Sequence, residues 1–435
     1  MNRREFLKGT VATTVGIAMT EKVVGEQGAK AGETNDSKLI ISPPMLQNHA
    51  EDSMGISFAV SALANGFVEY SEYPDMRNAK KVVCGGYRVT AMSDIAAQVL
   101  LTGLKPATKY YYRIGADRIQ YITGYQMKKL GTEKDLRVYS FTTAGAKAPG
   151  HFAVINDTHR KWEIIDMLMK RIDDINPPCV IWNGDTANCE ESFAEVVETF
   201  LKQKITRVDY ASNRPYLLAP GNHDLRGRAM RNLEKVWMFR NPAERPARDW
   251  DLGRNFAVRQ GDIALIGLDT AEDKLDGNPV FAGLMVSEEY RKAQAVWLKD
   301  ALERPEIKSA PFVVAFCHIP IFDARPDKNP GDLYPADVAP GYVPKGWAEW
   351  QRSCNKLWGP ILDKAGCQLV MCAHTHAFRL NESEPGRSWA QIVGGGCVKE
   401  SATVIEGKVE NGELKVMVHF FDQPTREFTF KPRKV

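Results

Sequence analysis

From His151 onward, short apolar runs alternate with stretches of helical periodicity, and this alternation constrains the fold more than any other feature. Apolar runs at 152–155, 179–182 and 216–218 are separated by helical stretches at about 162–172 and 192–201. Alternation of this kind favours βαβ units. We therefore expect an α/β (α+β) fold of layered sheets covered by helices. Further expected elements are strands at 255–258, 263–268, 312–316 and 368–371, a helix near 287–302, and strands from 391 onward.

The preceding segment, 38–145, has the pattern of antiparallel strands instead. Large and small side chains alternate over 56–60, and Asn65-Gly66 is a hairpin-turn signal. The Leu-x-Pro-x-Thr-x-Tyr spacing that ends at Tyr110 resembles the tyrosine corner of fibronectin type III sandwiches, in which the hydroxyl bonds back to the upstream backbone. The resemblance implies an all-β fibronectin type III-like sandwich over 38–145, in which Tyr110 is structural.

The N-terminus resembles a twin-arginine export signal. Arg3-Arg4 precedes the mildly apolar residues 9–19, and Ala29-Lys30-Ala31 fits a small-x-small cleavage site. A membrane span needs about 20 apolar residues, so the segment 9–19 is too short for one. We expect residues 1–31 to be removed and the mature protein to be periplasmic or extracellular. The alternative is a frayed helical tail with a chance arginine pair.

Composition limits the class of protein further. The chain has 435 residues, enough for two or three domains, and its 57 basic against 54 acidic side chains give a net charge of only +3. That surplus is too small for a dedicated nucleic-acid binder. The eight cysteines are scattered without a CxxC pair, which indicates small buried side chains rather than a disulfide scaffold.

Clusters of Asp, Asn and His follow five of the apolar runs. Ligands of open α/β sheets bind outside the carboxyl ends of the strands, so these clusters can converge on one site. Their donors outnumber the three or four ligands of a single zinc ion and suit two ions ~3.5–4 Å apart that share one carboxylate, for which Asp185 is the natural bridge. The residues are Asp157, His159, Asp185, Asn222, His223, His318, His374 and His376.

The five motifs, Asp-x-His, Gly-Asp, Gly-Asn-His-Asp, an isolated His and His-x-His, resemble those of the calcineurin-like metallophosphoesterases. Ala373 stands where the last motif usually has Gly, which leaves the ligands intact. The resemblance runs from about 151 to 378. It implies a first metal site formed by Asp157, His159, Asp185 and His376, and a second formed by Asp185, Asn222, His318 and His374.

The same resemblance implies a mechanism. His223, oriented by Asp224, would contact the phosphate and stabilise or protonate the leaving oxygen, and a metal-bridged hydroxide would attack in line. A sandwich ahead of this catalytic domain, 150–433, also resembles purple acid phosphatases. Their iron-ligating Tyr is replaced here by Asn188, so a purple iron–tyrosinate site is not supported. Two divalent or trivalent ions of Mn, Zn or Fe remain compatible with the donors.

Two further segments are candidates for substrate contact. Arg226 and Arg228 open a basic stretch, 225–250, and either could clamp a phosphate, although charge runs of this kind are usually solvated helix and loop. The loop 323–350 is rich in Pro, Gly and aromatic residues, some of which could stack on a substrate or pack within the loop.

The sequence thus predicts an exported, dinuclear-metal-dependent phosphoesterase that hydrolyses small phosphate monoesters or diesters. A purple-acid-phosphatase-like acid phosphatase and a nucleotide hydrolase are alternatives within the enzyme class. An alternative of another class is a non-catalytic extracytoplasmic binding module in which the metals are structural.

Overall fold

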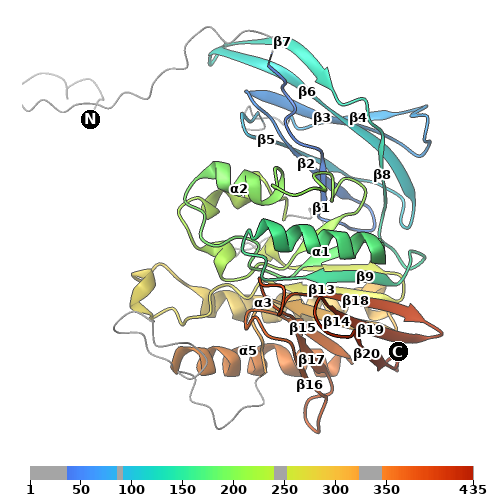
Figure 1. Ribbon diagram of the computed structural model, residues 1–435, viewed down its shortest axis with the longest axis vertical. Helices are drawn as coiled ribbons and strands as arrows, with labels where there is room; N and C mark the ends of the chain where they lie inside the picture. Colours follow the sequence, from blue (N-terminus) through green and yellow to red (C-terminus); the bar gives the residue numbers. More distant parts are fainter. Residues whose placement is uncertain (1–36, 86–91, 240–251, 323–344, 435) are drawn as a thin grey trace, which may run out of the picture. The chain divides into compact units, whose positions relative to one another are not determined.

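The computed structural model describes residues 37–85, 92–239, 252–322 and 345–434, and Lys38–Val435 forms one compact unit. Within these ranges the strands form three sheets (Figure 1). The predicted signal segment, 1–31, and most of the loop 323–350 lie outside the described residues. None of the described helices has the length and apolar character that a membrane span requires.

The largest sheet has nine strands in the order β20-β19-β18-β9-β10-β11-β1-β2-β5. Its strands β9, β10 and β11 are parallel neighbours, and their continuous apolar sequences are typical of strands covered on both faces. The strands are β1 (Met45–Gln47), β2 (Met54–Ala59), β5 (Ala96–Leu101), β9 (His151–Ile155), β10 (Val180–Trp182), β11 (Tyr216–Leu218), β18 (Thr403–Glu410), β19 (Glu413–Phe420) and β20 (Arg426–Phe430).

A six-stranded sheet in the order β12-β13-β14-β15-β17-β16 packs against it through a shared core. Val154 and Ile181 from the first sheet and Leu265, Val314 and Met371 from the second are buried in this core. The strands of the six-stranded sheet are β12 (Phe256–Gln260), β13 (Ile263–Leu268), β14 (Phe312–Cys317), β15 (Leu369–Cys372), β16 (Arg379–Asn381) and β17 (Ala390–Val393).

Helices cover the outer faces of both sheets. The predicted apolar stripe of α1 is buried against β9 and β10, and α1 ends at Asn176, which is left-handed and precedes Pro177. A capping box between Ser192 and Glu195 begins α2. The expected α/β fold of layered sheets covered by helices is therefore confirmed. The helices are α1 (Trp162–Ile175), α2 (Phe193–Phe200), η2 (His223–Leu225), η3 (Met230–Lys235), η5 (Leu252–Arg254), η6 (Pro279–Phe281), α3 (Ser287–Leu302), α4 (Pro305–Lys308) and α5 (Lys345–Lys364).

The third sheet lies in the N-terminal part of the chain and faces β2 and β5 across a separate core. The predicted tyrosine-corner contact is present, because the Lys105 N–H donates to the Tyr110 hydroxyl at 2.9 Å. The Asn65-Gly66 prediction is wrong, since both residues lie inside β3 and not in a hairpin turn. A Cβ on Gly66 would lie 2.3 Å from the Ala97 Cβ, so Gly serves close packing there. The strands are β3 (Ala64–Ser71), β4 (Lys80–Val83), β6 (Lys109–Thr123), β7 (Gln126–Lys134) and β8 (Tyr139–Thr142).

One strand joins the N-terminal part to the rest of the unit. β1 pairs in parallel with β11, with Gln47 opposite Tyr216, so the nine-stranded sheet continues across both parts. Buried hydrogen bonds add to this pairing: the Tyr112 hydroxyl donates to the Ser212 carbonyl at 2.7 Å. The division into a sandwich at 38–145 and a catalytic domain at 150–433 stays a prediction.

Candidate metal centre

The predicted ligands are brought together where the carboxyl ends of strands from two sheets meet. Asp157 and His159 follow β9, Asp185 follows β10, and Asn222 follows β11. From the six-stranded sheet, His318 follows β14, while His374 and His376 follow β15. The site is therefore supplied by both packed sheets and depends on their relative placement.

The backbone at the strand ends takes a conformation that L-residues rarely adopt. Five ligand positions are left-handed, at a cost of about 1–2 kcal/mol each. They are Asp157 (φ 47°), His159 (φ 44°), Asp185 (φ 49°), His374 (φ 69°) and His376 (φ 55°). Gly184 (φ 79°) precedes Asp185, and a Cβ there would lie 2.5 Å from His318 Nδ1. Strain of this kind clusters at functional sites, because surrounding structure must hold it in place.

The first predicted metal position has its donors in close contact. His159 Nε2 and His376 Nε2 lie 3.1 Å apart, and His376 Nε2 lies 3.3 Å from Asp157 Oδ1. Asp185 Oδ2 lies 3.7 Å from His159 Nε2. These separations suit donor atoms around one ion, since each metal–ligand bond is about 2.0–2.2 Å long.

The second position shares Asp185 with the first. Asp185 Oδ2 lies 3.1 Å from His318 Nε2, and the ligand atoms of Asp185, His318 and His374 lie within 4.8 Å of one another. The Asn222 side-chain amide contacts His374 Nδ1 at 2.9 Å. The His318 Nδ1–H donates to the Asn183 carbonyl at 2.9 Å, which leaves Nε2 directed at the site.

The buried atoms of the centre that make no hydrogen bond include Asp157 Oδ1 and His318 Nε2. Burial alone would lower the pKa of His318, but the carboxylates of Asp185 and Asp157 raise it to about 10. Burial alone would raise the pKa of Asp157, but His318 and the neighbouring histidines hold it well below its usual range. The carboxylates thus create a field that favours positive charge. The ligand atoms Asp157 Oδ1 and His318 Nε2, which make no hydrogen bond, fit coordination of metal ions.

His223 has a different partner from the one expected. The sequence predicted that Asp224 orients it, but the His223 Nδ1–H donates to the Asn188 carbonyl at 2.7 Å. Asp224 is fully buried and instead accepts hydrogen bonds from the Thr186 backbone N–H and hydroxyl and from the Gly221 N–H. Asp224 therefore braces the loops that carry Asp185 and Asn222.

Of the two candidate arginines, Arg226 lies at the centre. Its Nη1 is 3.4 Å from His223 Nε2, and its guanidinium donates to Glu272 Oε2 and Asp273 Oδ1, both at 2.9 Å. Arg228 is exposed. Within the second segment proposed for substrate contact, Trp350 is fully buried in the core beside α3 and so is not placed to stack on a substrate.

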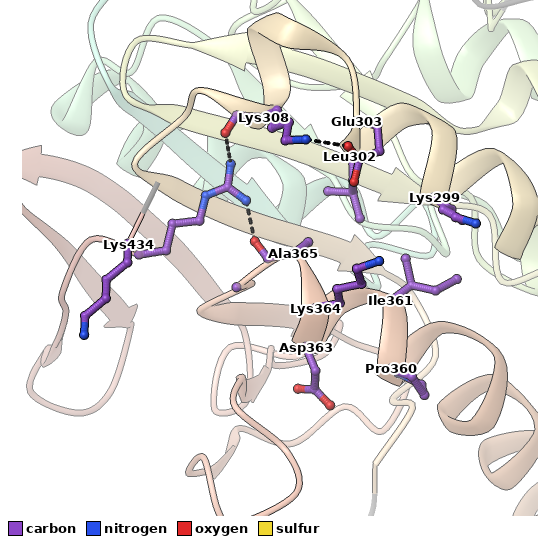
Figure 2. Close-up of a pocket in the computed structure, with 12 residues that line it drawn as sticks. Lys299, Leu302, Glu303, Lys308, Pro360, Ile361, Asp363, Lys364, Ala365 and Lys434 are labelled. Atoms are coloured by element: carbon purple, nitrogen blue, oxygen red, sulfur yellow. Dashed lines mark hydrogen bonds and ion pairs between the residues drawn. The ribbon is translucent and has the colours of Figure 1, made fainter.

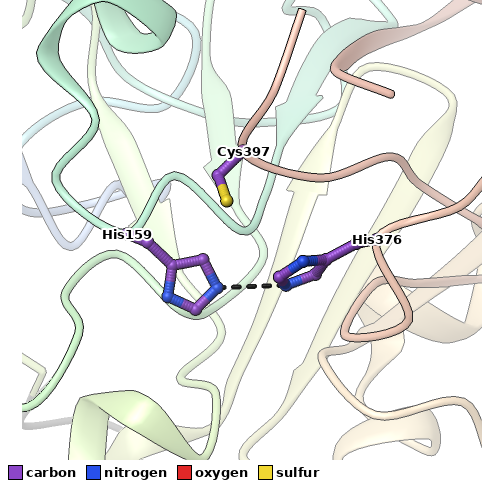
Figure 3. A group of neighbouring side chains, drawn as sticks. All are labelled: His159, His376 and Cys397. Atoms are coloured by element: carbon purple, nitrogen blue, oxygen red, sulfur yellow. Dashed lines mark hydrogen bonds between the residues drawn. The ribbon is translucent and has the colours of Figure 1, made fainter. Parts of the chain in front are cut away.

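Sequence reasoning missed four residues of the centre. Glu272 and Asp273 follow β13 and so carried the same strand-end signal as the predicted ligands. Asp273 Oδ2 lies 3.9 Å from His374 Nε2. Asn156 donates to Asp157 Oδ2 at 2.8 Å. Cys397 lies beside His159 and His376 (Figure 3), although a buried structural role was expected for the cysteines.

A separate pocket of about 580 Å³ lies between α3, α5 and the C-terminal residues (Figure 2). Several lysines line it, and Arg433 beside them donates to backbone carbonyls, including that of Lys308. None of the predicted metal ligands lines this pocket. It is therefore distinct from the metal centre.

The chain is similar in sequence to known phosphoesterases. Residues 150–378 match the model of the family described as calcineurin-like phosphoesterase. The chain is 26% identical over 300 residues to "Probable purple acid phosphatase 20" of Arabidopsis thaliana. The matched region covers 67% of this chain and 56% of that protein. "Purple acid phosphatase 21" of the same plant is 25% identical over 294 residues, covering 63% of this chain and 56% of that protein. The chain thus spans about half the length of these relatives.

Solved structures share the fold at low sequence identity. The structure of PhoD has a TM-score of 0.56 and 13% identity, covering 92% of this chain and 90% of PhoD. The purple acid phosphatase PPD1 from yellow lupin (Lupinus luteus) seeds has a TM-score of 0.57 and 12% identity, covering 89% of this chain and 73% of PPD1. Because the family model matches residues 150–378, more than half of the chain, the chain belongs to the calcineurin-like phosphoesterase family.

Proposed function

We propose that the protein is a phosphoesterase that uses two metal ions and acts on small phosphate monoesters or diesters. The observation that carries the proposal is the position of Asp185, whose carboxylate lies between two groups of histidines. One buried carboxylate with imidazoles on both sides is the arrangement that two metal ions share. Family membership supports the same activity.

The ligands are assigned as the sequence predicted. Asp157, His159, Asp185 and His376 would hold the first ion, and Asp185, Asn222, His318 and His374 the second. When bound, the ions would neutralise the non-bridging phosphate oxygens and acidify the attacking water. Mn, Zn and Fe all suit carboxylate, amide and imidazole donors.

The protein's own side chains would position the phosphate. Because Arg226 Nη1 and His223 Nε2 lie 3.4 Å apart, one phosphate group can contact both. A bound anion raises the pKa of an adjacent imidazole, which favours a protonated His223 that donates from Nε2 to the leaving oxygen. The Asn188 carbonyl holds the opposite ring nitrogen and so fixes the direction of that donation. Arg228 is exposed and is the less suitable of the two arginines for binding the phosphate.

The activity is tested by hydrolysis of p-nitrophenyl phosphate and bis-p-nitrophenyl phosphate. The protein is stripped of metal and then reloaded with Mn, Zn or Fe. We expect turnover to return with metal and to fall at least about a hundredfold in Asp185→Asn. Asp422→Asn, the same change at an exposed acid, is the matched control. No turnover with any metal in the folded protein would favour the non-catalytic binding module.

We also propose export by the twin-arginine route, supported by the order of Arg3-Arg4, the apolar residues 9–19 and Ala29-Lys30-Ala31. Replacing Arg3 and Arg4 with Lys keeps the charge and removes the motif. The expected result is accumulation of uncleaved protein in the cytoplasm. Unchanged export and cleavage would contradict the proposal.

A further inference from the structure

Cys397 lies beside two of the assigned ligands of the first metal ion. Its Sγ and one ring nitrogen each of His159 and His376 lie within 4.8 Å of one another, and Figure 3 shows the contact between the two imidazoles. Two ligands of one zinc ion are at most about 4.4 Å apart when one is sulfur, given bonds of about 2.3 and 2.1 Å. The spacing between Sγ and the two imidazoles, at most 4.8 Å, is therefore close to what ligands of one ion require.

Three consecutive glycines before Cys397 bring its loop onto the metal ligands. A Cβ on Gly396 would lie 2.5 Å from the His376 Cβ, and one on Gly394 would lie 2.2 Å from Asn156 Oδ1. A Cβ on Gly395 would meet the Ser401 carbonyl oxygen at 1.5 Å. Side chains at these positions would push the loop, and with it the thiol, away from the site.

Hydrogen bonds hold this loop in place. The Gly394 N–H donates to the Cys372 carbonyl at 2.8 Å, and the Gly395 N–H donates to the Thr403 hydroxyl at 2.9 Å. Asn156 Nδ2 donates both to the Gly395 carbonyl and to Asp157 Oδ2, the carboxylate of an assigned ligand. The thiol-bearing loop and the metal ligand are thus tied through one amide.

A second observation points to a ligand at this position. Asp157 is fully buried, its Oδ1 has no hydrogen-bond partner, and this atom lies 3.3 Å from His376 Nε2. This carboxylate oxygen lies beside the same two imidazoles that neighbour the Cys397 thiol, and carboxylate and imidazole together are a donor set for a cation.

We propose that Cys397 Sγ is an additional ligand of the first metal ion, beside Asp157, His159, Asp185 and His376. The thiol would release its proton to solvent and bind as the thiolate. A sulfur ligand favours Zn or Fe over Mn, so this site would select a more thiophilic ion than the second. The inference rests on the proposed dinuclear function and names a property of the first site alone.

Titration of the metal-free, reduced protein with Co²⁺ tests it, because thiolate ligation gives a charge-transfer band in the near ultraviolet. We expect this band in the wild type and in Cys189→Ser, and its loss in Cys397→Ser. Cys189 is the matched control. Its exposed thiol lies 3.7 Å from His223 Nδ1, but it is not part of the group formed by His159, His376 and Cys397. Visible ligand-field bands of Co²⁺ should persist in all three proteins.

Absence of the charge-transfer band in the wild type, or its survival in Cys397→Ser, would overturn the inference. If ligand-field bands and metal-dependent hydrolysis remain in either case, the proposed function stands and only the role of Cys397 fails. Absence of ligand-field bands as well would defeat both. X-ray absorption of the zinc-loaded wild type needs no variant, and a sulfur scatterer at about 2.3 Å is expected. A zinc shell containing only nitrogen and oxygen would contradict the proposal.

Discussion

At the residue scale, His223 shows how the surroundings of a side chain define its role. Its Nδ1 is held by the Asn188 carbonyl, and Nε2 faces the Arg226 guanidinium. Burial lowers the pKa of His223, so the free ring is neutral at neutral pH and accepts a hydrogen bond at Nε2. The contribution of His223 to the rate of hydrolysis should then depend on how basic the leaving oxygen is.

We predict that His223→Ala lowers kcat/KM by about 10²- to 10⁴-fold for an alkyl phosphate, which has a basic leaving group. The loss should be much smaller for p-nitrophenyl phosphate, whose leaving group needs little protonation. A series of esters with graded leaving-group pKa values measures the difference. His419→Ala, which changes a histidine on β19, is the control. Equal losses for all esters would show that His223 does not donate the proton.

Arg226 leads to a second prediction. Its guanidinium is braced by Glu272 and Asp273, and a fork of donors suits a phosphate better than the single ammonium of Lys. Arg226→Lys is expected to raise KM for phosphate esters, and Ki for inorganic phosphate, by about tenfold. The exposed Arg228→Lys is the matched control and should change neither constant. An equal rise of KM and Ki in both variants would show that Arg226 does not bind the phosphate specifically.

At the scale of the element, β18 carries a buried carboxylate that links three strands. Glu406 on β18 lies 2.9 Å from His151 Nε2 on β9 and 3.0 Å from His419 Nε2 on β19. Burial alone would raise the pKa of Glu406, but the two histidines lower it to about 2. A carboxylate with a lowered pKa in the folded protein stabilises it above the unfolded pKa, and this contribution is lost as pH falls.

We therefore predict that Glu406→Gln lowers the free energy of unfolding by about 1–2 kcal/mol near pH 6. The difference from the wild type should shrink as pH falls from about 4.5 toward the Glu406 pKa of about 2. Urea denaturation at stepped pH measures both proteins, with the exposed Glu427→Gln as control. A difference that stays constant over this range would contradict the assigned ion pairs.

At the scale of the whole molecule, the described part of Lys38–Val435 is one compact unit whose largest sheet runs through both of its parts. The β1–β11 pairing and the buried Tyr112–Ser212 hydrogen bond couple these parts. Elements that share a continuous sheet and buried hydrogen bonds tend to unfold together.

We predict a single unfolding transition. Tyr112→Phe should lower the free energy of unfolding by about 1–3 kcal/mol, because it leaves the Ser212 carbonyl without its hydrogen bond. All nine Trp residues lie beyond residue 150, so their fluorescence reports on that part, whereas labelling of Cys84 reports on residues 38–145. Within each protein, wild type or variant, the two probes should give the same midpoint of unfolding. Tyr111→Phe, on the neighbouring and less buried position of β6, is the control. Separate midpoints would instead support an independent sandwich domain.

Local patterns in the sequence were sufficient to predict the α/β alternation, the buried face of α1 and the strand ends that bear the predicted ligands. Periodicity and strand-end positions are properties of a few consecutive residues, so they can be identified without knowing what packs against them. Within one open sheet, strand ends meet at a common edge, which is why Asp157, Asp185 and Asn222 could be expected together.

Only the tertiary structure decided the partners of these side chains. Asn188 rather than Asp224 holds His223, Glu272 braces Arg226, and Cys397 lies beside His376. Asn65-Gly66 lies in a strand, where Gly66 packs closely against Ala97. Each of these contacts depends on how two sheets, or a sheet and a distant loop, are packed together. Such packing is set by side-chain complementarity between segments far apart in the chain, which no local pattern encodes.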